Sequence, residues 1–311
     1  MLSLLGPTAS GKTALAVQLA DHLGGELLSA DSRQVYRGMD IGTGKDLSEY
    51  ELEGKHIPYH LIDIVPAGEQ YNLFAWQQAF HEAYAGIVAR GALPILCGGT
   101  GLYAESVLGG YQLPDVTPNE ALRASLQGAT IEELRERLAS YGPLHNVTDL
   151  DSPARAIRAI EIADYIAQQR STGLPHSSYP PIESCILCLD LEREERRRRI
   201  SRRLRQRLEE QDMLGEVRGL LEAGIAPETL LRYGLEYRFL TLHLTGELSY
   251  EAMYRGLETA IHQFAKRQMT WFRGMERRGF TLHYIDATQP RPAQLAEALS
   301  LWERWQQHTA D

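Results

Sequence analysis

Eight consecutive residues near the start of the chain have the pattern of a phosphate-binding loop. They follow a short apolar run and read Gly6-Pro7-Thr8-Ala9-Ser10-Gly11-Lys12-Thr13. The pattern G-x-x-x-x-G-K-(S/T), placed between a strand and a helix, lets backbone N–H groups converge on phosphate oxygens while the helix adds the positive end of its dipole. Lys12 would supply a fixed cation, and the Thr13 hydroxyl is suited to ligate Mg²⁺. The chain is therefore predicted to bind a polyphosphate, which the loop alone does not identify.

A carboxylate and a second glycine-rich turn follow two further predicted strands. Asp31 comes directly after a strand predicted at residues 26–30, and Gly98-Gly99-Thr100-Gly101 follows one predicted at residues 93–97. Asp31 could be the general base that takes a proton from an incoming nucleophile, or it could cap a helix or hold magnesium through water. Thr100 could cap the next helix or donate to a substrate, since the glycines allow a close backbone approach. A tight strand-to-helix turn needs the same residues, so both alternatives stay open.

Other residues that ligate metals in proteins give weaker patterns. Asp63 could be a magnesium ligand, but an ordinary turn aspartate is the favoured interpretation. Cys185 and Cys188 have the spacing of half a zinc site, yet residues three apart in a strand face opposite sides and the chain has no second pair. No pair of histidines at i and i+4 stands next to a glutamate. The sequence therefore predicts no protein-only metal centre.

The elements that must position these residues alternate between short apolar runs and helical patterns. Such alternation predicts βαβ crossovers and a parallel sheet flanked by helices, as in P-loop NTPases. Ligands of these sheets bind at the carboxyl ends of the strands, where the phosphate loop, Asp31 and Gly98–Gly101 all fall. In the first hundred residues the predicted strands are 2–5, 26–30, 61–65 and 93–97, and the predicted helices are 13–23 and 73–89.

Between residues 111 and 183 the strand pattern disappears. We interpret this stretch as an all-helical insertion into a catalytic core made of residues 1–110 and 184–311. Its predicted helices are 118–126, 130–140 and 152–169, followed by a loop rich in Ser, Gly and Pro at 171–181. Beyond it we expect strands at 185–191 and 281–285, and helices from 192, at 214–223, at 249–277 and at 292–307.

Composition bounds the class of protein. The 311 residues suffice for one large α/β domain or a domain with an insertion, and 43 % hydrophobic residues are ordinary for a globular enzyme. No apolar run approaches a membrane span, and a phosphate loop at residue 6 leaves no room for a secretion signal. Three cysteines give no disulfide framework, which fits a reducing cytoplasm.

The net charge of −9 argues against simple nucleic-acid binding, but it hides a local asymmetry. Arginine supplies most of the positive charge, and much of it is clustered at residues 193–207 and 267–278. Arginine pairs bidentately with phosphate and stacks on bases, so such clusters could contact RNA. The alternative is a solvated helix face, and both interpretations stay open.

Four blocks in order along the chain resemble the bacterial tRNA dimethylallyltransferase family. They span nearly the whole sequence, and the second and fourth blocks are the most distinctive. The blocks are the phosphate loop, residues 31–43 (Asp-Ser-Arg-Gln-Val-Tyr-Arg-Gly-Met-Asp-Ile-Gly-Thr), residues 98–103 (Gly-Gly-Thr-Gly-Leu-Tyr) and residues 263–273 (Gln-Phe-Ala-Lys-Arg-Gln-Met-Thr-Trp-Phe-Arg).

The resemblance implies a reaction in which a dimethylallyl group passes from dimethylallyl diphosphate to the exocyclic amine of the adenine just 3′ of a tRNA anticodon. Magnesium would assist, with Thr13 as its ligand, and residues 6–13 would bind the diphosphate rather than ATP. Thr8 matches the family threonine that contacts the diphosphate, and Asp31 matches the general base. Arg203, in the family pattern R-I-x-x-R, would stabilise the departing diphosphate. The chain contains no Asp-Asp pair that could hold the diphosphate through magnesium.

The resemblance also implies contacts with the tRNA anticodon stem-loop. In the core these would come from the stretch Asp31-Ser32-Arg33-Gln34 and from Thr100. In the insertion they would come from Arg155 and Arg158, which are three apart and share a helix face. We expect a cytoplasmic monomer without membrane attachment.

The chain departs from the family pattern at three places. Arg33 replaces an apolar or small residue, Gly44-Lys45-Asp46 stands where Ala-Lys-Pro is common, and Gly234-Leu235-Glu236-Tyr237-Arg238 replaces Gly-Tyr-Lys-Glu. Three rival functions remain: prenylation of free adenylate, an ATP-dependent P-loop kinase, and a non-catalytic RNA-binding protein. The predicted insertion and the arginine clusters favour a macromolecular acceptor, because a free nucleotide needs neither.

Overall fold

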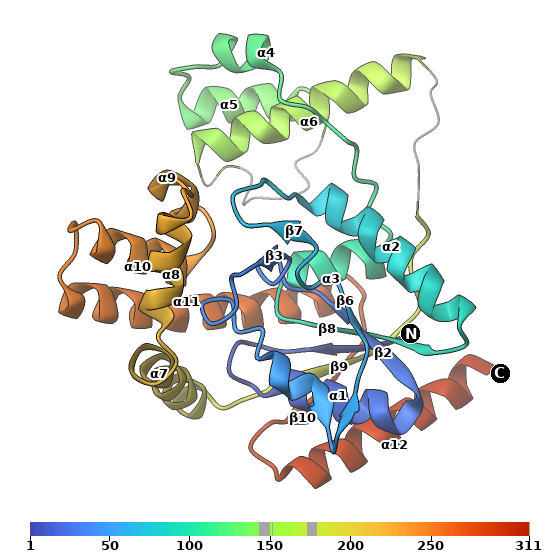
Figure 1. The fold of residues 1–311 in the computed structure, drawn as a ribbon. Helices are drawn as coiled ribbons and strands as arrows, with labels where there is room; N and C mark the ends of the chain where they lie inside the picture. The colour runs from blue at the N-terminus through green and yellow to red at the C-terminus, as the bar shows by residue number, and fades with distance from the viewer. Residues whose placement is uncertain (143–149, 151, 173–178, 311) are drawn as a thin grey trace. The chain divides into compact units, whose positions relative to one another are not determined.

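The computed structural model describes residues 1–142, 150, 152–172 and 179–310 (Figure 1). The chain falls into two compact units. The core unit comprises Met1–Gly110 and Pro180–Asp311, and the insertion unit comprises Tyr111–Tyr179. Part of the predicted loop at 171–181 lies outside the described residues.

A six-stranded parallel sheet forms the centre of the core unit, which confirms the predicted fold class. The strand order is β10-β9-β1-β8-β2-β6. β1 lies inside the sheet and all its residues are buried, so it carries leucines on both faces instead of alternating apolar and exposed polar residues. The strands are β1 (Leu2–Leu5), β2 (Gly25–Ser29), β6 (Tyr59–His60), β8 (Leu93–Gly98), β9 (Cys185–Asp190) and β10 (Leu282–Asp286).

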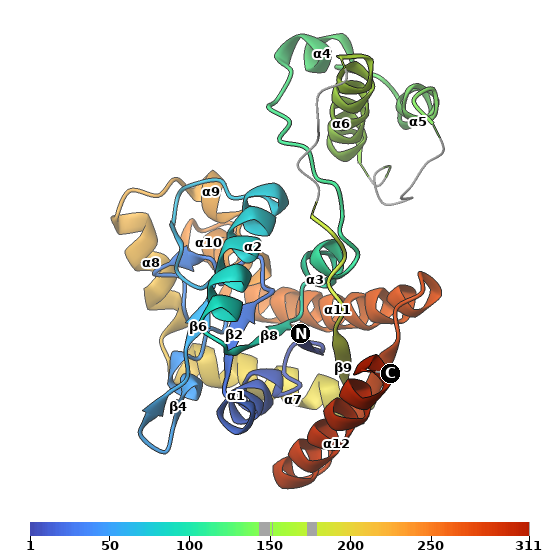
Figure 2. The ribbon, with the colours of Figure 1, turned by 90° about the vertical axis from the view of Figure 1, so that its right-hand side faces the viewer.

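Helices cover both faces of this sheet (Figures 1 and 2). On one face α1 (Lys12–Leu23) and α12 (Arg291–Ala310) pack into a core of their own. The opposite core takes in α2 (Leu73–Ala89), α3 (Gly101–Leu108), α7 (Arg193–Glu209), α8 (Met213–Glu222), α9 (Pro227–Leu230), α10 (Leu235–Leu244) and α11 (Tyr250–Arg277). Cys185 lies in the first core and Cys188 in the second, so the two thiols face opposite sides of β9 as its period predicts.

The predicted third strand at 61–65 is wrong. The strand that pairs with β2 ends at His60, and the chain then turns because Leu61 and Asp63 take left-handed φ angles of 67° and 55°. Beyond the turn, β7 (Val65–Pro66) pairs instead with β3 (Tyr36–Arg37) in a separate two-stranded sheet. Elements that were not predicted include the short helix η1 (Leu47–Tyr50), the hairpin of β4 (Glu51–Leu52) with β5 (Lys55–His56), and the helices α9 and α10.

The insertion unit contains α4 (Glu120–Ser125), α5 (Ile131–Ala139) and α6 (Pro153–Thr172), and its described residues form no strand. A small apolar core of its own surrounds Leu134, Ala156 and Ile160. Each of the two shorter helices begins at a capping residue, which is Asn119 for α4 and Thr130 for α5. In the described part of the whole chain, no helix is both long and apolar enough to cross a bilayer.

Candidate active site

The phosphate loop connects β1 to α1 and holds an open helix N-terminus. Gly11 and Ala9 take left-handed φ angles of 80° and 62°, which turn the chain into the helix. No side chain caps α1, so its first N–H groups remain available to an anion. Ser10 is 1 % exposed, and its Oγ has no hydrogen-bond partner among the described residues. A buried hydroxyl without a partner, next to uncapped N–H groups, fits a bound phosphate and its metal.

Three cations belong to the phosphate loop or lie beside it. Lys12 and Arg203 were predicted, and Arg291 was not. Arg203 of α7 donates from Nη2 to the Thr8 hydroxyl. The Nη2 atom of Arg291, in the first turn of α12, lies 2.6 Å from where a Cβ on Gly11 would stand. Burial, reinforced by neighbouring Arg207, lowers the pKa of Arg203 to about 10, and burial also lowers the pKa of Lys12. Arg203 stays protonated at neutral pH, and the two side chains place desolvated basic groups at the loop.

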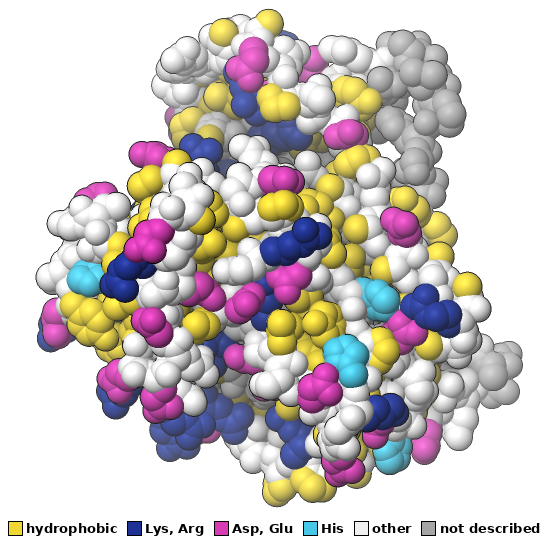
Figure 3. All heavy atoms as spheres, in the orientation of Figure 1, with side chains coloured by type: hydrophobic (Ala, Val, Ile, Leu, Met, Phe, Trp, Pro, Cys, Tyr) yellow, Lys and Arg dark blue, Asp and Glu magenta, His cyan; other side chains and the backbone are white. Residues whose placement is uncertain are grey.

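The inner and outer faces of α7 differ in their contacts. Arg203 and buried Arg207 point inward, and Arg207 pairs with Asp46 at 3.1 Å. The exposed arginines gather over α7 in Figure 3 and pair with acids on the same helix, such as Arg198 with Glu195. The outer face is therefore exposed to solvent, and its contact with RNA stays a prediction.

The glycine-rich turn after β8 is fastened to the Asp31 stretch. Thr100 occupies the N-cap position of α3, but its Oγ accepts from the Ser32 N–H at 3.3 Å instead of capping the helix. Its own N–H donates to the carbonyl of Ala30 at 3.2 Å. Gly98 needs to be glycine because a Cβ there would collide with the Ala30 carbonyl. The proposed helix cap at Thr100 is thus corrected to a bridge between two loops.

Asp31 is half-buried at the carboxyl end of β2. Its Oδ1 accepts from the Arg33 N–H at 2.9 Å, an Asx-type turn that fixes the carboxylate without capping a helix. Its Oδ2 carries no hydrogen bond from the described residues and is left for a ligand. Arg33 extends toward α10, where its Nε lies 3.5 Å from the place of a Cβ on Gly234.

Gln34 stands between Asp31 and the loop that follows it. Its amide accepts from Ser29 Oγ at 2.9 Å and donates to the Gly44 carbonyl at 3.1 Å. Both ends of the amide are therefore engaged inside the core unit, and its contact with tRNA stays a prediction.

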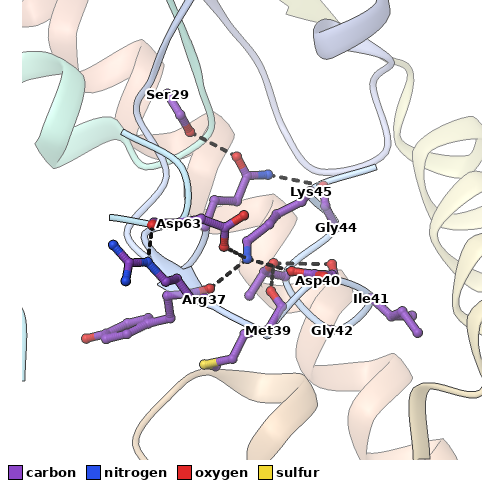
Figure 4. Close-up of polar contacts among 12 residues, drawn as sticks. Ser29, Arg37, Met39, Asp40, Ile41, Gly42, Gly44, Lys45 and Asp63 are labelled. Carbon is purple, nitrogen blue, oxygen red and sulfur yellow. Dashed lines mark hydrogen bonds and ion pairs between the residues drawn. The ribbon is translucent and has the colours of Figure 1, made fainter. Parts of the chain in front are cut away.

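The loop from Tyr36 to Lys45 is held by a buried lysine (Figure 4). Lys45 Nζ donates to the Tyr36 carbonyl at 2.6 Å, to Asp40 Oδ1 at 2.7 Å and to Asp63 Oδ1. This lysine side chain is fully buried. Asp63 is thus the partner of Lys45, and its interpretation as a turn aspartate replaces that of a magnesium ligand.

Glu216 of α8 holds the same loop from outside and was missed by the sequence analysis. Its carboxylate accepts from the N–H groups of Asp40 and Ile41 at 2.7 Å each and of Gly42 at 3.0 Å. It also accepts from Tyr237 Oη at 2.6 Å. Such a row of backbone N–H groups would bind an anion, and the protein fills it with its own carboxylate. No local sequence signal marks Glu216, because the backbone N–H groups that it binds are 174 to 176 residues away.

Arg155 and Arg158 belong to the insertion unit, so they are described apart from the core residues. Arg155 is exposed. Arg158 donates to Glu161 at 3.1 Å and to the Val116 carbonyl at 2.7 Å. Glu161 is buried and also accepts from Arg123 at 2.8 Å. Arg158 therefore holds its own unit together, and tRNA contact by either arginine stays a prediction.

The donor set of the site fits magnesium only together with a ligand. The described residues contain no group of three histidine, cysteine or acidic side chains that could hold a metal. The hydroxyls of Ser10 and Thr13 stand in the loop, and Mg²⁺ is commonly held by one or two protein oxygens completed by phosphate and water. These residues fit a metal that arrives with a diphosphate.

Comparison with known proteins gives concordant matches. The family model "IPP transferase" matches residues 34–275, and the model "Isopentenyl transferase" matches residues 1–62. A "tRNA dimethylallyltransferase 1" of Porphyromonas gingivalis is 61 % identical over 97 % of this chain and 99 % of its own length. A "tRNA dimethylallyltransferase 2" of Bacteroides fragilis is 56 % identical over 93 % of this chain and 94 % of its own. The crystal structure of a tRNA isopentenylpyrophosphate transferase from Bacillus halodurans superposes with a TM-score of 0.69 and 30 % identity, covering 99 % of this chain and 98 % of that one.

Proposed function

Because the chain belongs to the IPP transferase family, we propose that it modifies tRNA by transferring a dimethylallyl group from dimethylallyl diphosphate to an adenine amine. The acceptor would be the adenine 3′ of the anticodon, and diphosphate would leave. One observation carries the proposal. The Asp31 carboxylate, with a free oxygen, is tied through Ser32 and Thr100 to the turn beside a phosphate loop that gathers desolvated cations.

The phosphate loop and its cations would act on the leaving group. As the bond between the prenyl carbon and the diphosphate oxygen breaks, negative charge grows on the diphosphate. Lys12, Arg203 and Arg291 lie where they would neutralise it in a desolvated site, where electrostatic stabilisation is strongest. Thr13, with the Ser10 hydroxyl near it, would hold Mg²⁺, which supplies further positive charge to the diphosphate.

Asp31 would act on the nucleophile. The lone pair of the adenine amine is delocalised into the purine ring, so attack improves when a proton leaves as the carbon–nitrogen bond forms. The free Oδ2 of Asp31 would take that proton as a general base. The adenine must leave its stack to reach the carboxylate, which suits single-stranded loops of RNA. The insertion unit and the stretch Asp31–Gln34 would grip the anticodon stem-loop.

The structure disfavours the kinase alternative. An ATP-dependent kinase of this fold needs a second carboxylate for magnesium, and Asp63, the residue considered for it, is bound to buried Lys45. Prenylation of free adenylate uses the same core residues, so it remains the rival that an experiment must separate. The predicted cytoplasmic location and monomeric state belong to this proposal as well.

The test is incorporation of labelled dimethylallyl into unmodified tRNA, with free AMP and ATP as competing substrates. Transfer to tRNA but not to AMP is expected, and phosphoryl transfer from ATP without prenyl incorporation would overturn the proposal. Asp31→Asn should retain tRNA affinity in a gel shift but lower the single-turnover rate by at least about 10²-fold, the usual share of a general base. Asp21→Asn, on the exposed part of α1, should react like the wild type. An Asp31→Asn enzyme that keeps its rate would place the base elsewhere.

A further inference from the structure

Gln268 of α11 joins the two loops that carry the two halves of the proposed reaction. Its Oε1 accepts from the Thr8 N–H at 2.9 Å, and its Nε2 donates to the Gly99 carbonyl at 2.8 Å. The side chain is 7 % exposed and its partners lie 260 and 169 residues away along the chain. A single buried amide therefore connects the phosphate loop to the turn after β8.

The chemistry of this bridge requires an amide. Thr8 offers a donor and Gly99 an acceptor, so the connecting side chain must accept at one end and donate at the other. A glutamate would place an oxygen against the Gly99 carbonyl, and methionine would satisfy neither partner. Because both partners are backbone groups of fixed polarity, the orientation of the amide is determined by them.

The second glycine loop is shaped to receive this face of α11. A Cβ on Gly99 would collide with Gln268 Nε2, and a Cβ on Gly101 would collide with the Trp271 indole. Gln268 and Trp271 are three apart on the helix and share a face. The glycines of one block and the glutamine and tryptophan of another thus form a single packed joint.

The joint lies in the middle of a chain of contacts that crosses the site. On one side, Thr8 accepts from Arg203 through its hydroxyl. On the other side, Thr100 follows Gly99 and accepts from the Ser32 N–H, next to Asp31. Moving Gln268 would therefore shift the leaving-group side relative to the general-base side.

We infer that Gln268 is a positioning residue that sets the distance between the diphosphate cradle and the Asp31 carboxylate. The inference rests on the proposed transfer reaction. Gln268 touches neither reacting group, and it acts by holding Thr8 and Gly99 in register. Misplacement of reacting groups by about 1 Å costs about 100-fold in rate, so the loss of this bridge should slow transfer while both substrates still bind.

The experiment compares the full-length Gln268→Met and Gln268→Asn enzymes with the wild type and with Gln263→Met. Gln263 is on the same helix but exposed, so its replacement should leave the rate unchanged. With enzyme in excess over tRNA and well above the Kd for tRNA, and with dimethylallyl diphosphate saturating, the single-turnover rate constant of each Gln268 variant should fall about 10- to 100-fold. The Kd for tRNA and for inorganic diphosphate should stay within about threefold of the wild type.

The rate constant separates positioning from folding. A purely structural role would reduce the fraction of enzyme that binds tRNA in a stoichiometric titration, which counts folded enzyme, and leave the single-turnover rate constant unchanged. That result overturns the inference, as does a loss confined to tRNA affinity. If the Met variant does not fold, the shorter Asn variant, which keeps the amide, decides by the same rate constant. A wild type that transfers no prenyl group to tRNA would instead refute the proposed function, so the two failures are distinguishable.

Discussion

At the scale of single residues, the cations around the phosphate loop have acidic side chains such as Glu49 in their neighbourhood but no direct ion pair with them in the described part of the chain. Among the described residues, no ion pair joins Lys12 or Arg203 to an acid, and burial lowers the pKa of both. Confined positive charge of this kind is relieved when an anion binds. We therefore expect a bound diphosphate to relieve this charge, in keeping with the proposed function.

Arg203→Ala should slow prenyl transfer much more than it weakens tRNA binding. The substitution removes a cation from the leaving group and frees the Thr8 hydroxyl, and loss of one such preorganised donor costs about 10²- to 10³-fold in rate. Single-turnover rates and gel shifts on the same preparations measure both quantities. Arg202→Ala, one residue along α7 and exposed, is the matched control. A larger fall in tRNA affinity than in rate would reassign Arg203 to RNA positioning.

Sequence reasoning reached the site residues that belong to local patterns and missed those that act from far away. Thr8, Asp31 and Thr100 stand at strand ends, where the parallel-sheet rule places ligands. Gln268, Glu216 and Arg291 reach these loops through long-range contacts that no sequence spacing indicates. Gln268 lies within the fourth family block, but only the structure shows that it binds both Thr8 and Gly99.

At the scale of elements, one buried carboxylate ties the edge of the sheet to its covering helix. Glu26 of β2 accepts from Arg90, the last cap of α2, at 2.7 and 3.0 Å, and contacts His60 of β6 at 2.7 Å. The Arg90 guanidinium holds the pKa of Glu26 below its ordinary value, with a smaller contribution from His60. This cluster links β2, the strand that leads to Asp31, to the neighbouring edge strand β6 and to the end of α2.

Glu26→Gln should destabilise the protein in a pH-dependent way. Because the folded-state pKa is lowered, the contribution is fully present above the unfolded value of 4.5 and is lost as the pH falls through the folded-state pKa. At pH 7 the free energy of unfolding should fall by about 1 to 2 kcal/mol, a figure discounted because Arg90 is half-exposed. Urea unfolding at pH 7 and below pH 4.5 measures it. Glu51→Gln, in an exposed pair with His56, should change little, and a pH-independent loss at Glu26 would mean that packing rather than charge is involved.

Element prediction succeeded where apolar runs were buried and failed where the backbone reversed. The helix at 73–89 and the strands of the sheet's centre follow from periodicity and burial. Leu61 and Ile62, which follow His60, are buried in a turn, so their apolar character led to the wrong prediction of a strand. The chain turns there because Leu61 and Asp63 take positive φ angles, and the sequence gives no hint of this because neither residue is a glycine.

At the scale of the whole molecule, each unit has an apolar core of its own, and we expect each to fold by itself. Among the described residues, neither apolar core of the sheet includes any from Tyr111–Tyr179, and the insertion unit has its own core and a buried Glu161 bound by two arginines. We therefore expect the core unit to bind the prenyl donor and carry out the transfer, and both units to contribute to tRNA affinity. The sequence predicted the all-helical character of the insertion because the strand pattern disappears there. Its contribution to tRNA binding stays a prediction.

Replacing residues 111–179 by a short Gly/Ser linker should leave a folded core that binds diphosphate as the full chain does. Diphosphate affinity depends on the loop cations, all of which belong to the core unit. Affinity for tRNA should fall, and the slope of log Kd against log salt should drop by about one for each tRNA phosphate that the shortened protein no longer neutralises. Filter binding from about 50 to 200 mM salt measures the slope. Arg155→Ala in the full chain should reproduce part of that decrease. If the shortened protein keeps the tRNA affinity and the salt slope of the full chain, the insertion contributes no RNA contact. The arginines of the core unit would then have to bind the anticodon stem-loop alone.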